Sequence, residues 1–192
     1  MPFDAMNDTP DEALLVLYAN GDAAAAKALV MRLTPRVLGY ATRLLKDHAE
    51  AEDVAQEAML RLWKIAPDWR QGEARVTTWL YRVVSNLCTD RLRKRRAVGL
   101  EDVAEPEDGR APVTETMIER ERAAALAAGL ATLPDRQRQA VVLRHLEGAT
   151  NPEIAQVLEI SVEAVESLTA RGKRALKAAL ADRRKDLGYE DD

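Results

Sequence analysis

The sequence predicts an all-α protein with two small helical domains joined by an acidic flexible linker, the second domain containing a helix-turn-helix. The chain has 192 residues and is 47% hydrophobic, which is enough to form one large or two small cores. Aromatic residues make up only 4%. Ala, Leu, Arg and Glu dominate instead, and they lose little side-chain freedom in a helix.

The first domain is expected to cover residues 8–96. Its first helix should begin at a capping box formed by residues 9–12 and end at Asn20-Gly21. Asp22 should cap a longer helix that extends to Lys46 with an interruption at Pro35. These signals predict two consecutive helices joined by a tight turn.

Two further helices complete the first domain. Residues 49–65 have helical periodicity, and Pro67 ends that pattern. After a loop, a fourth helix is expected to begin at Thr77 or Thr78 and to run to Arg96. Residues 97–113 then form the predicted linker, because they are acidic, contain proline and glycine, and lack apolar periodicity.

The second domain is expected to cover residues 114–185. Its first helix should run from Thr114 to Leu133, where Pro134 breaks it. Asp135 should cap a helix that reaches Glu147, with Gly148 as its stop signal. These helices lead into the segment with the most informative pattern.

Residues 151–180 contain a short helix, a tight break and a longer helix. Asn151, followed by Pro152, should cap the short helix, and Ser161 should cap the long one. One face of the long helix carries Val165, Leu168, Thr169, Gly172 and Leu176, and the opposite face carries Glu163, Ser167, Ala170, Arg171 and Arg174. This pattern fits a DNA-binding helix-turn-helix, although a plain pair of packed helices would show similar amphipathicity.

The net charge of −4 conceals two basic patches. Residues 82–96 have a local net charge of +5 and residues 171–185 one of +6, whereas residues 101–121 between them carry −6. Such segregation suggests a polyanionic partner. Helix C-termini also collect cations to complement the macrodipole, which is the simpler explanation for either patch alone.

The helix predicted from Thr78 to Arg96 has two contrasting faces. Its apolar face consists of Leu80, Val84, Leu87 and Cys88, and a polar line on the other side consists of Arg82, Asn86, Thr89 and Arg93. A solvated surface helix would also show such a line. Trp69 and Arg70 in the preceding loop supply an aromatic ring and a cation of the kind that receive unstacked bases of single-stranded nucleic acid.

Three motifs resemble those of bacterial extracytoplasmic-function sigma factors of the sigma-70 family. They are AEDVAQEAMLRLWK (residues 51–64), TWLYRVVSN (residues 78–86) and the stretch from LPDRQRQAV to KRAL (residues 133–176). The resemblance implies a two-domain initiation factor that binds core RNA polymerase, directs it to promoters and helps to melt the minus-ten element. It also implies control by an anti-sigma factor.

The resemblance assigns residues to three contacts. The helix that would bind polymerase carries Asp53, Gln56, Glu57, Leu60 and Arg61. Tyr81, Arg82, Asn86 and Asp90 match minus-ten contacts, and the polar line and the loop add Thr89, Arg93, Trp69 and Arg70. The expected minus-thirty-five contacts are Glu163, Ser167, Ala170, Arg171, Lys173 and Arg174. The DNA partner would be bound both as duplex and as melted non-template strand.

The chain departs from the family pattern at three places. Val76 stands where an aromatic residue often precedes the TWL motif, so the pocket for a flipped base should be lined differently. Glu159 stands where the turn usually has glycine, which would strain a left-handed conformation by about 1 kcal/mol or shift the turn. Glu163 and Glu166 bring negative charge to the helix expected to face DNA, where they would favour the helix N-terminus, remain solvated or accept a hydrogen bond from cytosine N4.

Other function classes fit less of the sequence. A one-component regulator with an N-terminal sensing or dimerisation domain would explain only the helix-turn-helix. His48 and His145 do not lie in E-x-x-H patterns, so neither an enzyme with a di-metal carboxylate site nor any cofactor is expected. Cys88 lies on an apolar face, as a small buried thiol does. No signal peptide or membrane-spanning segment is evident, which predicts a cytoplasmic protein.

Overall fold

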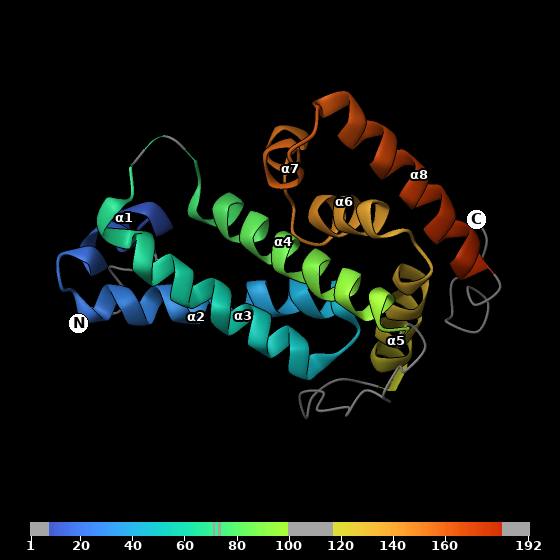
Figure 1. Cartoon of the computed structure of the whole chain (residues 1–192), viewed down its shortest axis with the longest axis horizontal. Helices are drawn as coiled ribbons and strands as arrows, with labels where there is room; N and C mark the ends of the chain where they lie inside the picture. Colours follow the sequence, from blue (N-terminus) through green and yellow to red (C-terminus); the bar gives the residue numbers. More distant parts are fainter. Residues whose placement is uncertain (1–7, 71, 73, 100–116, 182–192) are drawn as a thin grey trace. The chain divides into compact units, whose positions relative to one another are not determined.

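The computed structural model describes residues 8–70, 72, 74–99 and 117–181, and the regular structure in these ranges is helical (Figure 1). The chain divides into two compact units. Helices α1 to α4 belong to the first unit, and α5, α6, α8 and the first part of α7 belong to the second. The predicted all-α fold with two helical domains is confirmed.

The first unit is built around the long helix α2. The elements are α1 (Asp11–Ala19), α2 (Ala23–Leu45), α3 (His48–Ile65), the short 3-10 helix η1 (Ala66–Asp68) and α4 (Val76–Ala97). Helix α2 packs against α1, α3 and α4, and α3 also packs against α4 (Figure 1). Leu29, Leu33, Val54, Leu62 and Val84 are among the fully buried residues of this core.

A buried hydrogen bond joins two helices of this unit. The hydroxyl of Tyr40 in α2 lies 2.7 Å from that of Ser85 in α4, and both residues are buried. The Tyr40 ring also makes an edge contact with Tyr81, with ring centroids 5.1 Å apart. A buried hydroxyl without a partner would cost about 1–3 kcal/mol, so this pair fixes the register between α2 and α4.

The start of α1 differs from the predicted capping box. Pro10 is the N-cap residue and no side chain caps the helix. The Glu12 carboxylate instead accepts a hydrogen bond from the backbone N–H of Val76, at 2.9 Å. Helix α1 therefore supplies a cap for α4, whose own N-cap residue, Arg75, makes no side-chain cap.

The remaining helix ends of this unit follow local signals. Asp22 accepts from the N–H groups of Ala24 and Ala25, as predicted. The expected interruption at Pro35 was wrong, because α2 continues through it. Pro35 is exposed while the neighbouring Leu33 and Val37 remain buried, so packing preserves the helix despite the missing donor. Lys46 ends α2 in a left-handed conformation, with φ of 60°.

The second unit comprises α5 (Met117–Ala131), α6 (Asp135–His145), α7 (Asn151–Leu158) and α8 (Val162–Ala181). Helix α8 packs against both α5 and α6. Two buried glycines lie at these contacts: a Cβ on Gly172 would lie 2.5 Å from Val141 Cγ2, and one on Gly129 would lie 2.8 Å from Leu176 Cδ1. The predicted linker beyond Gly99 and the expected helix start at Thr114 lie outside the described residues.

The caps around α7 confirm one prediction and correct another. Thr150, rather than Asn151, caps α7: its N–H and hydroxyl both donate to Glu153 at 2.8 Å, and Glu153 N–H faces the Thr150 hydroxyl at 3.4 Å. Ser161 accepts from Ala164 N–H at 3.2 Å and caps α8, as predicted. Glu159 has φ of 55°, so the turn keeps its left-handed position without glycine.

Two of the helical glycines, Gly172 and Gly39, should respond oppositely to alanine. Glycine inside a helix costs about 1 kcal/mol relative to alanine. At Gly172 the new methyl would meet Val141 and the backbone oxygen of Gln137, and overpacking of about 1–3 kcal/mol outweighs that gain. At Gly39 the nearest atom is the flexible end of Arg43, 3.0 Å away. We expect thermal unfolding to show Gly172→Ala destabilised and Gly39→Ala stabilised; the same sign for both would contradict this packing.

Candidate nucleic-acid interface

Helix α4 presents the predicted polar line to solvent. Arg82, Asn86, Thr89 and Arg93 are all exposed along it. On the opposite face Leu80, Val84 and Cys88 are buried. Leu87, on the same apolar face, is only half-buried, so it lies at the edge of the packed surface. The buried face orients α4 so that the polar line remains accessible.

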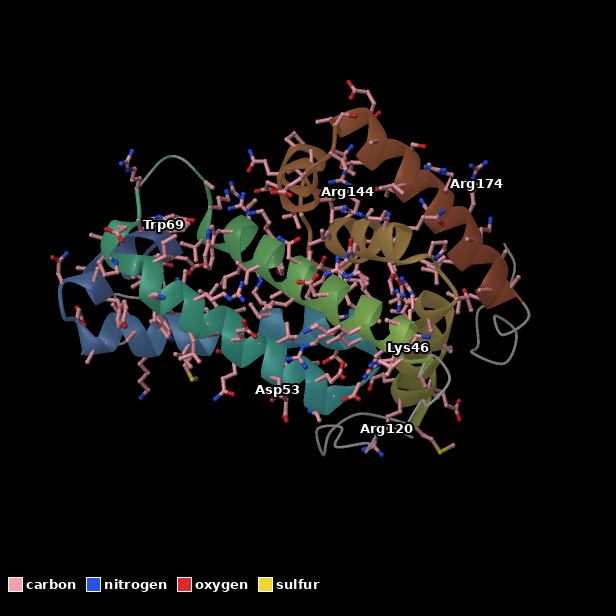
Figure 2. All side chains as sticks on the ribbon, viewed as in Figure 1. Lys46, Asp53, Trp69, Arg120, Arg144 and Arg174 are labelled. Atoms are coloured by element: carbon pink, nitrogen blue, oxygen red, sulfur yellow. The ribbon has the colours of Figure 1, made fainter. Side chains whose placement is uncertain are left out.

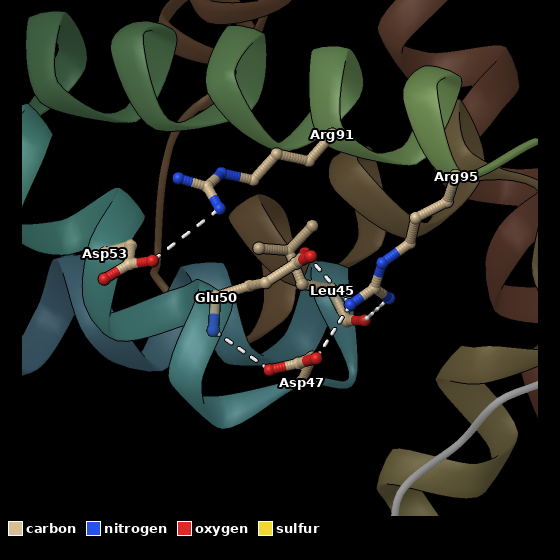
Figure 3. Close-up of polar contacts among 6 residues, drawn as sticks. All are labelled: Leu45, Asp47, Glu50, Asp53, Arg91 and Arg95. Atoms are coloured by element: carbon tan, nitrogen blue, oxygen red, sulfur yellow. Dashed lines mark hydrogen bonds and ion pairs between the residues drawn. The ribbon is translucent and has the colours of Figure 1, made fainter. Parts of the chain in front are cut away.

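The basic end of α4 is partly held by the turn between α2 and α3 (Figure 3). Arg95 Nη2 lies 2.8 Å from Asp47 Oδ2 and 2.9 Å from Glu50 Oε2, and its Nη1 donates to the carbonyl of Leu45 at 3.3 Å. Asp47 also accepts from the N–H of Glu50 at 2.9 Å and so caps α3. Arg95 therefore has a structural role that the sequence did not indicate.

The other cations at the C-terminal end of α4 face in different directions. Arg91 Nη1 lies 4.0 Å from Asp53 Oδ2 on α3 (Figure 3). Arg93 pairs with Asp90 on the exposed side, with Nη2 and Oδ1 2.9 Å apart. Lys94 and Arg96 are exposed. The predicted basic run thus divides into arginines that face α3 and cations that face solvent.

The loop before α4 contributes one aromatic contact. Trp69 is half-buried, and its ring makes an edge contact with Trp79 at a centroid separation of 6.3 Å (Trp69 in Figure 2). Arg70 beside it is exposed. Tyr81 and Val76, which the sequence analysis considered near the bases, lie in the core with 4% and 0% of their surface exposed. Both side chains therefore pack inside the first unit in this structure.

Helix α3 has one buried face and one exposed face. Val54, Ala58 and Leu62 are fully buried. The candidate partner-binding residues lie on the other side: Asp53, Gln56, Leu60 and Arg61 are exposed and Glu57, which pairs with Arg61, is half-buried (Asp53 in Figure 2). Leu60 has 60% of its surface exposed, so a large apolar side chain lies among charged neighbours.

A groove of about 560 Å³ lies between α3 and α4. Charged side chains form most of its wall, and Leu87 and Val98 add apolar surface. It is lined by Glu50, Glu57, Arg61, Leu87, Asp90, Arg91, Lys94, Arg95 and Val98. Sequence reasoning missed this groove because its residues come from two helices separated by a loop. The only hint in the sequence was the helical spacing of Glu50 and Glu57, which places both acids on one side of α3.

Helix α8 exposes every residue that the sequence analysis assigned to DNA contact. Glu163, Ser167, Ala170, Arg171, Lys173 and Arg174 are all solvent-exposed (Arg174 in Figure 2). Val165 and Gly172 are buried, while Leu168, Thr169 and Leu176 are partly buried. The predicted division into a packed face and an exposed face is confirmed.

Two titratable groups near α8 are perturbed. Glu163 has a lowered pKa because its own backbone N–H, and then the Ser161 hydroxyl, donate to its carboxylate. Burial lowers the pKa of His145, and the nearby cations Lys173 and Arg144 lower it further. His145 is consequently neutral near pH 7, and the basic character of this surface comes from lysine and arginine.

The described residues contain no group of three or more His, Cys, Asp or Glu side chains placed to hold a metal ion. Among the same residues, no helix combines the length and apolar character needed to cross a membrane.

Comparison with protein families gives two matches in chain order. Residues 29–98 match the family described as Sigma-70 region 2, and residues 123–176 match Sigma-70, region 4. The RNA polymerase sigma-H factor of Pseudomonas aeruginosa is 31% identical over 188 residues, covering 88% of this chain and 93% of that protein. The ECF RNA polymerase sigma factor SigM of Mycobacterium tuberculosis is 32% identical over 181 residues, covering 93% and 88%.

Solved structures show a similar fold. CnrH in complex with the cytosolic domain of CnrY is 27% identical, with a TM-score of 0.68, and covers 90% of this chain and 97% of that one. The sigma factor RpoE in complex with the anti-sigma factor NepR from Bartonella quintana is 21% identical, with a TM-score of 0.66, and covers 81% and 96%.

The structural role of Arg95 gives a stability prediction. Arg95→Gln should lower the free energy of unfolding by about 1–2 kcal/mol, because Asp47 and Glu50 would lose a charged donor at a partly buried site. Lys94→Gln removes the same charge from an exposed neighbour and should change stability by less than about 0.5 kcal/mol. Chemical denaturation of both variants provides the test, and equal stabilities would contradict the structural role.

Proposed function

The chain belongs to the extracytoplasmic-function group of the sigma-70 family. From this membership we propose which surface of each domain acts in transcription initiation. The protein is a sigma factor, because it matches both region 2 and region 4 of the family. These two regions bind core RNA polymerase and promoter DNA. The match of both regions favours this function over a one-component regulator. We assign residues 8–96 to region 2, residues 97–113 to the linker and residues 114–185 to region 4.

We propose that the outer face of α3 binds core polymerase. The exposed Leu60 carries this assignment, because a large apolar side chain surrounded by Asp53, Gln56 and Arg61 gains most from a partner that covers it. The surrounding charges would orient the partner and limit wrong pairings.

We propose that the polar line of α4 contacts the minus-ten element on the melted non-template strand. Arg82, Asn86 and Thr89 lie on one exposed face, and Asp90 and Arg93 continue it. Trp69 and Arg70 lie in the loop directly before α4, where an aromatic ring and a cation favour an unstacked base. Tyr81 acts through the core, because it holds α4 against Tyr40.

We propose that α8 enters the major groove at the minus-thirty-five element. Its exposed face carries Glu163, Ser167 and Ala170 in the N-terminal half, followed by Arg171, Lys173 and Arg174. In a helix-turn-helix the N-terminal residues of the second helix contact base edges. Cations further along the helix would hold phosphates and set its position on the duplex.

We further propose that the protein acts in the cytoplasm, without catalytic activity or a cofactor of its own, under the control of an anti-sigma factor. The resemblance to the family supports this regulation. The relative CnrH, solved in complex with the cytosolic domain of CnrY, supports binding of a protein partner to the same fold.

Polymerase binding provides the test of this function. Leu60→Asp should abolish association with core polymerase, and thus promoter-specific run-off transcription, while the helical content is retained. Met31→Asp is the matched control, because Met31 on α2 is similarly exposed, at 65%. Undiminished binding by Leu60→Asp would contradict the assignment of α3. If the unmodified protein directed core polymerase to no promoter, the proposed function as a sigma factor would be contradicted.

Base contact by α4 gives a second test. Asn86→Ala should impair open-complex formation, measured by permanganate reactivity of the melted strand, with a stability change below about 0.5 kcal/mol because Asn86 is exposed. Leu80→Ala should instead lower the stability of the fold. Leu80 is 1% exposed, and truncation of a buried leucine costs about 2–5 kcal/mol. Comparable loss of stability in both variants would identify Asn86 as structural.

A further inference from the structure

Helix α8 changes sign along its length. Its first two turns carry two exposed acids, Glu163 and Glu166, and no basic residue. Exposed cations begin only in the third turn and comprise Arg171, Lys173, Arg174 and Lys177. The end of the helix that contacts base edges in a helix-turn-helix is therefore acidic, and the end available to phosphates is basic.

The two acids differ in their surroundings. The Glu163 carboxylate accepts from its own N–H and from Ser161, so it is already engaged at the helix N-terminus. Glu166 is exposed one turn later, and no other side chain within the described ranges forms an ion pair or hydrogen bond with it. The residues three and four positions further along, Thr169 and Ala170, carry no charge. Among the residues that the structure describes, Glu166 is thus a carboxylate without a counterion.

An ionised carboxylate at the DNA surface weakens binding to most sequences, because it is repelled by phosphates and can only accept hydrogen bonds. In the major groove, guanine offers two acceptors, and thymine offers an acceptor and a methyl group. Adenine offers a donor beside the N7 acceptor. Cytosine offers its N4 donor without a neighbouring acceptor, so it is the base that compensates a carboxylate best.

We propose that Glu166 is a specificity-determining residue that selects a cytosine in the minus-thirty-five element. This inference rests on the proposed function, since it requires α8 to lie in the major groove. Arg171, Lys173 and Arg174 supply attraction to phosphates that does not depend on sequence, and Glu166 restricts that attraction to sites with a matching amino group.

Selection from a randomised element tests this assignment. The full-length protein with core polymerase would be used to select promoter duplexes whose minus-thirty-five element is random. We expect the wild type to enrich cytosine at one position by at least about fivefold over other bases, the scale of one mismatched base pair. Glu166→Gln should shift that position toward adenine, because an amide can both donate to N7 and accept from N6. Glu166→Ala should lose the preference there.

The control is Glu121→Gln, which removes one exposed negative charge from α5 and should leave every base preference unchanged. Cytosine enriched equally by the wild type and Glu166→Gln would overturn the inference while leaving the proposed function intact. So would a wild type that selects other bases but no cytosine. A wild type that selects no sequence at all would overturn the proposed function, and this inference with it.

Discussion

The packing of α4 against the rest of the first unit is the constraint on which the arrangement of its functional surface depends. Three polar contacts fix this helix along its length. Glu12 caps its first residue, the Tyr40–Ser85 hydrogen bond holds its middle, and Arg95 ties its last turns to Asp47 and Glu50. Because each anchor comes from a different element, α4 can neither rotate nor slide without losing one of them. The exposed polar line is a consequence of this fixed orientation.

This arrangement explains how a chain with a net charge of −4 accommodates a basic helix end. Arg91 and Arg95 face acids at the start of α3, so part of the local charge is compensated within the fold. Lys94 and Arg96 are exposed to solvent instead, and Lys94 remains available to phosphates. The basic run therefore serves two purposes, cohesion between helices and attraction of a polyanion. Arginine suits the first purpose, because its planar guanidinium can bind Asp47, Glu50 and a backbone carbonyl together.

The sequence was sufficient where the determining interaction is local. Asp22 and Ser161 cap neighbouring residues, and the apolar period of α3 identified its buried and exposed faces. It failed where the partner is distant along the chain. Glu12 satisfies Val76 rather than its own helix, and Tyr81 is buried because Tyr40 lies across from it. Neither contact leaves a periodic signal, since each depends on how two helices meet. The groove between α3 and α4 escaped prediction for the same reason.

Both candidate DNA surfaces combine cations with acids, but in different ways. On α4 the compensating acids come mainly from α3, across a tertiary contact, whereas α8 carries its exposed acids in its first two turns and its exposed cations in the later turns. Attraction to phosphates grows with the number of uncompensated cations and does not distinguish sequences. Limiting that number makes binding depend on base contacts and on the polymerase that presents the promoter. A net acidic factor with two small basic surfaces is therefore suited to act within a larger complex.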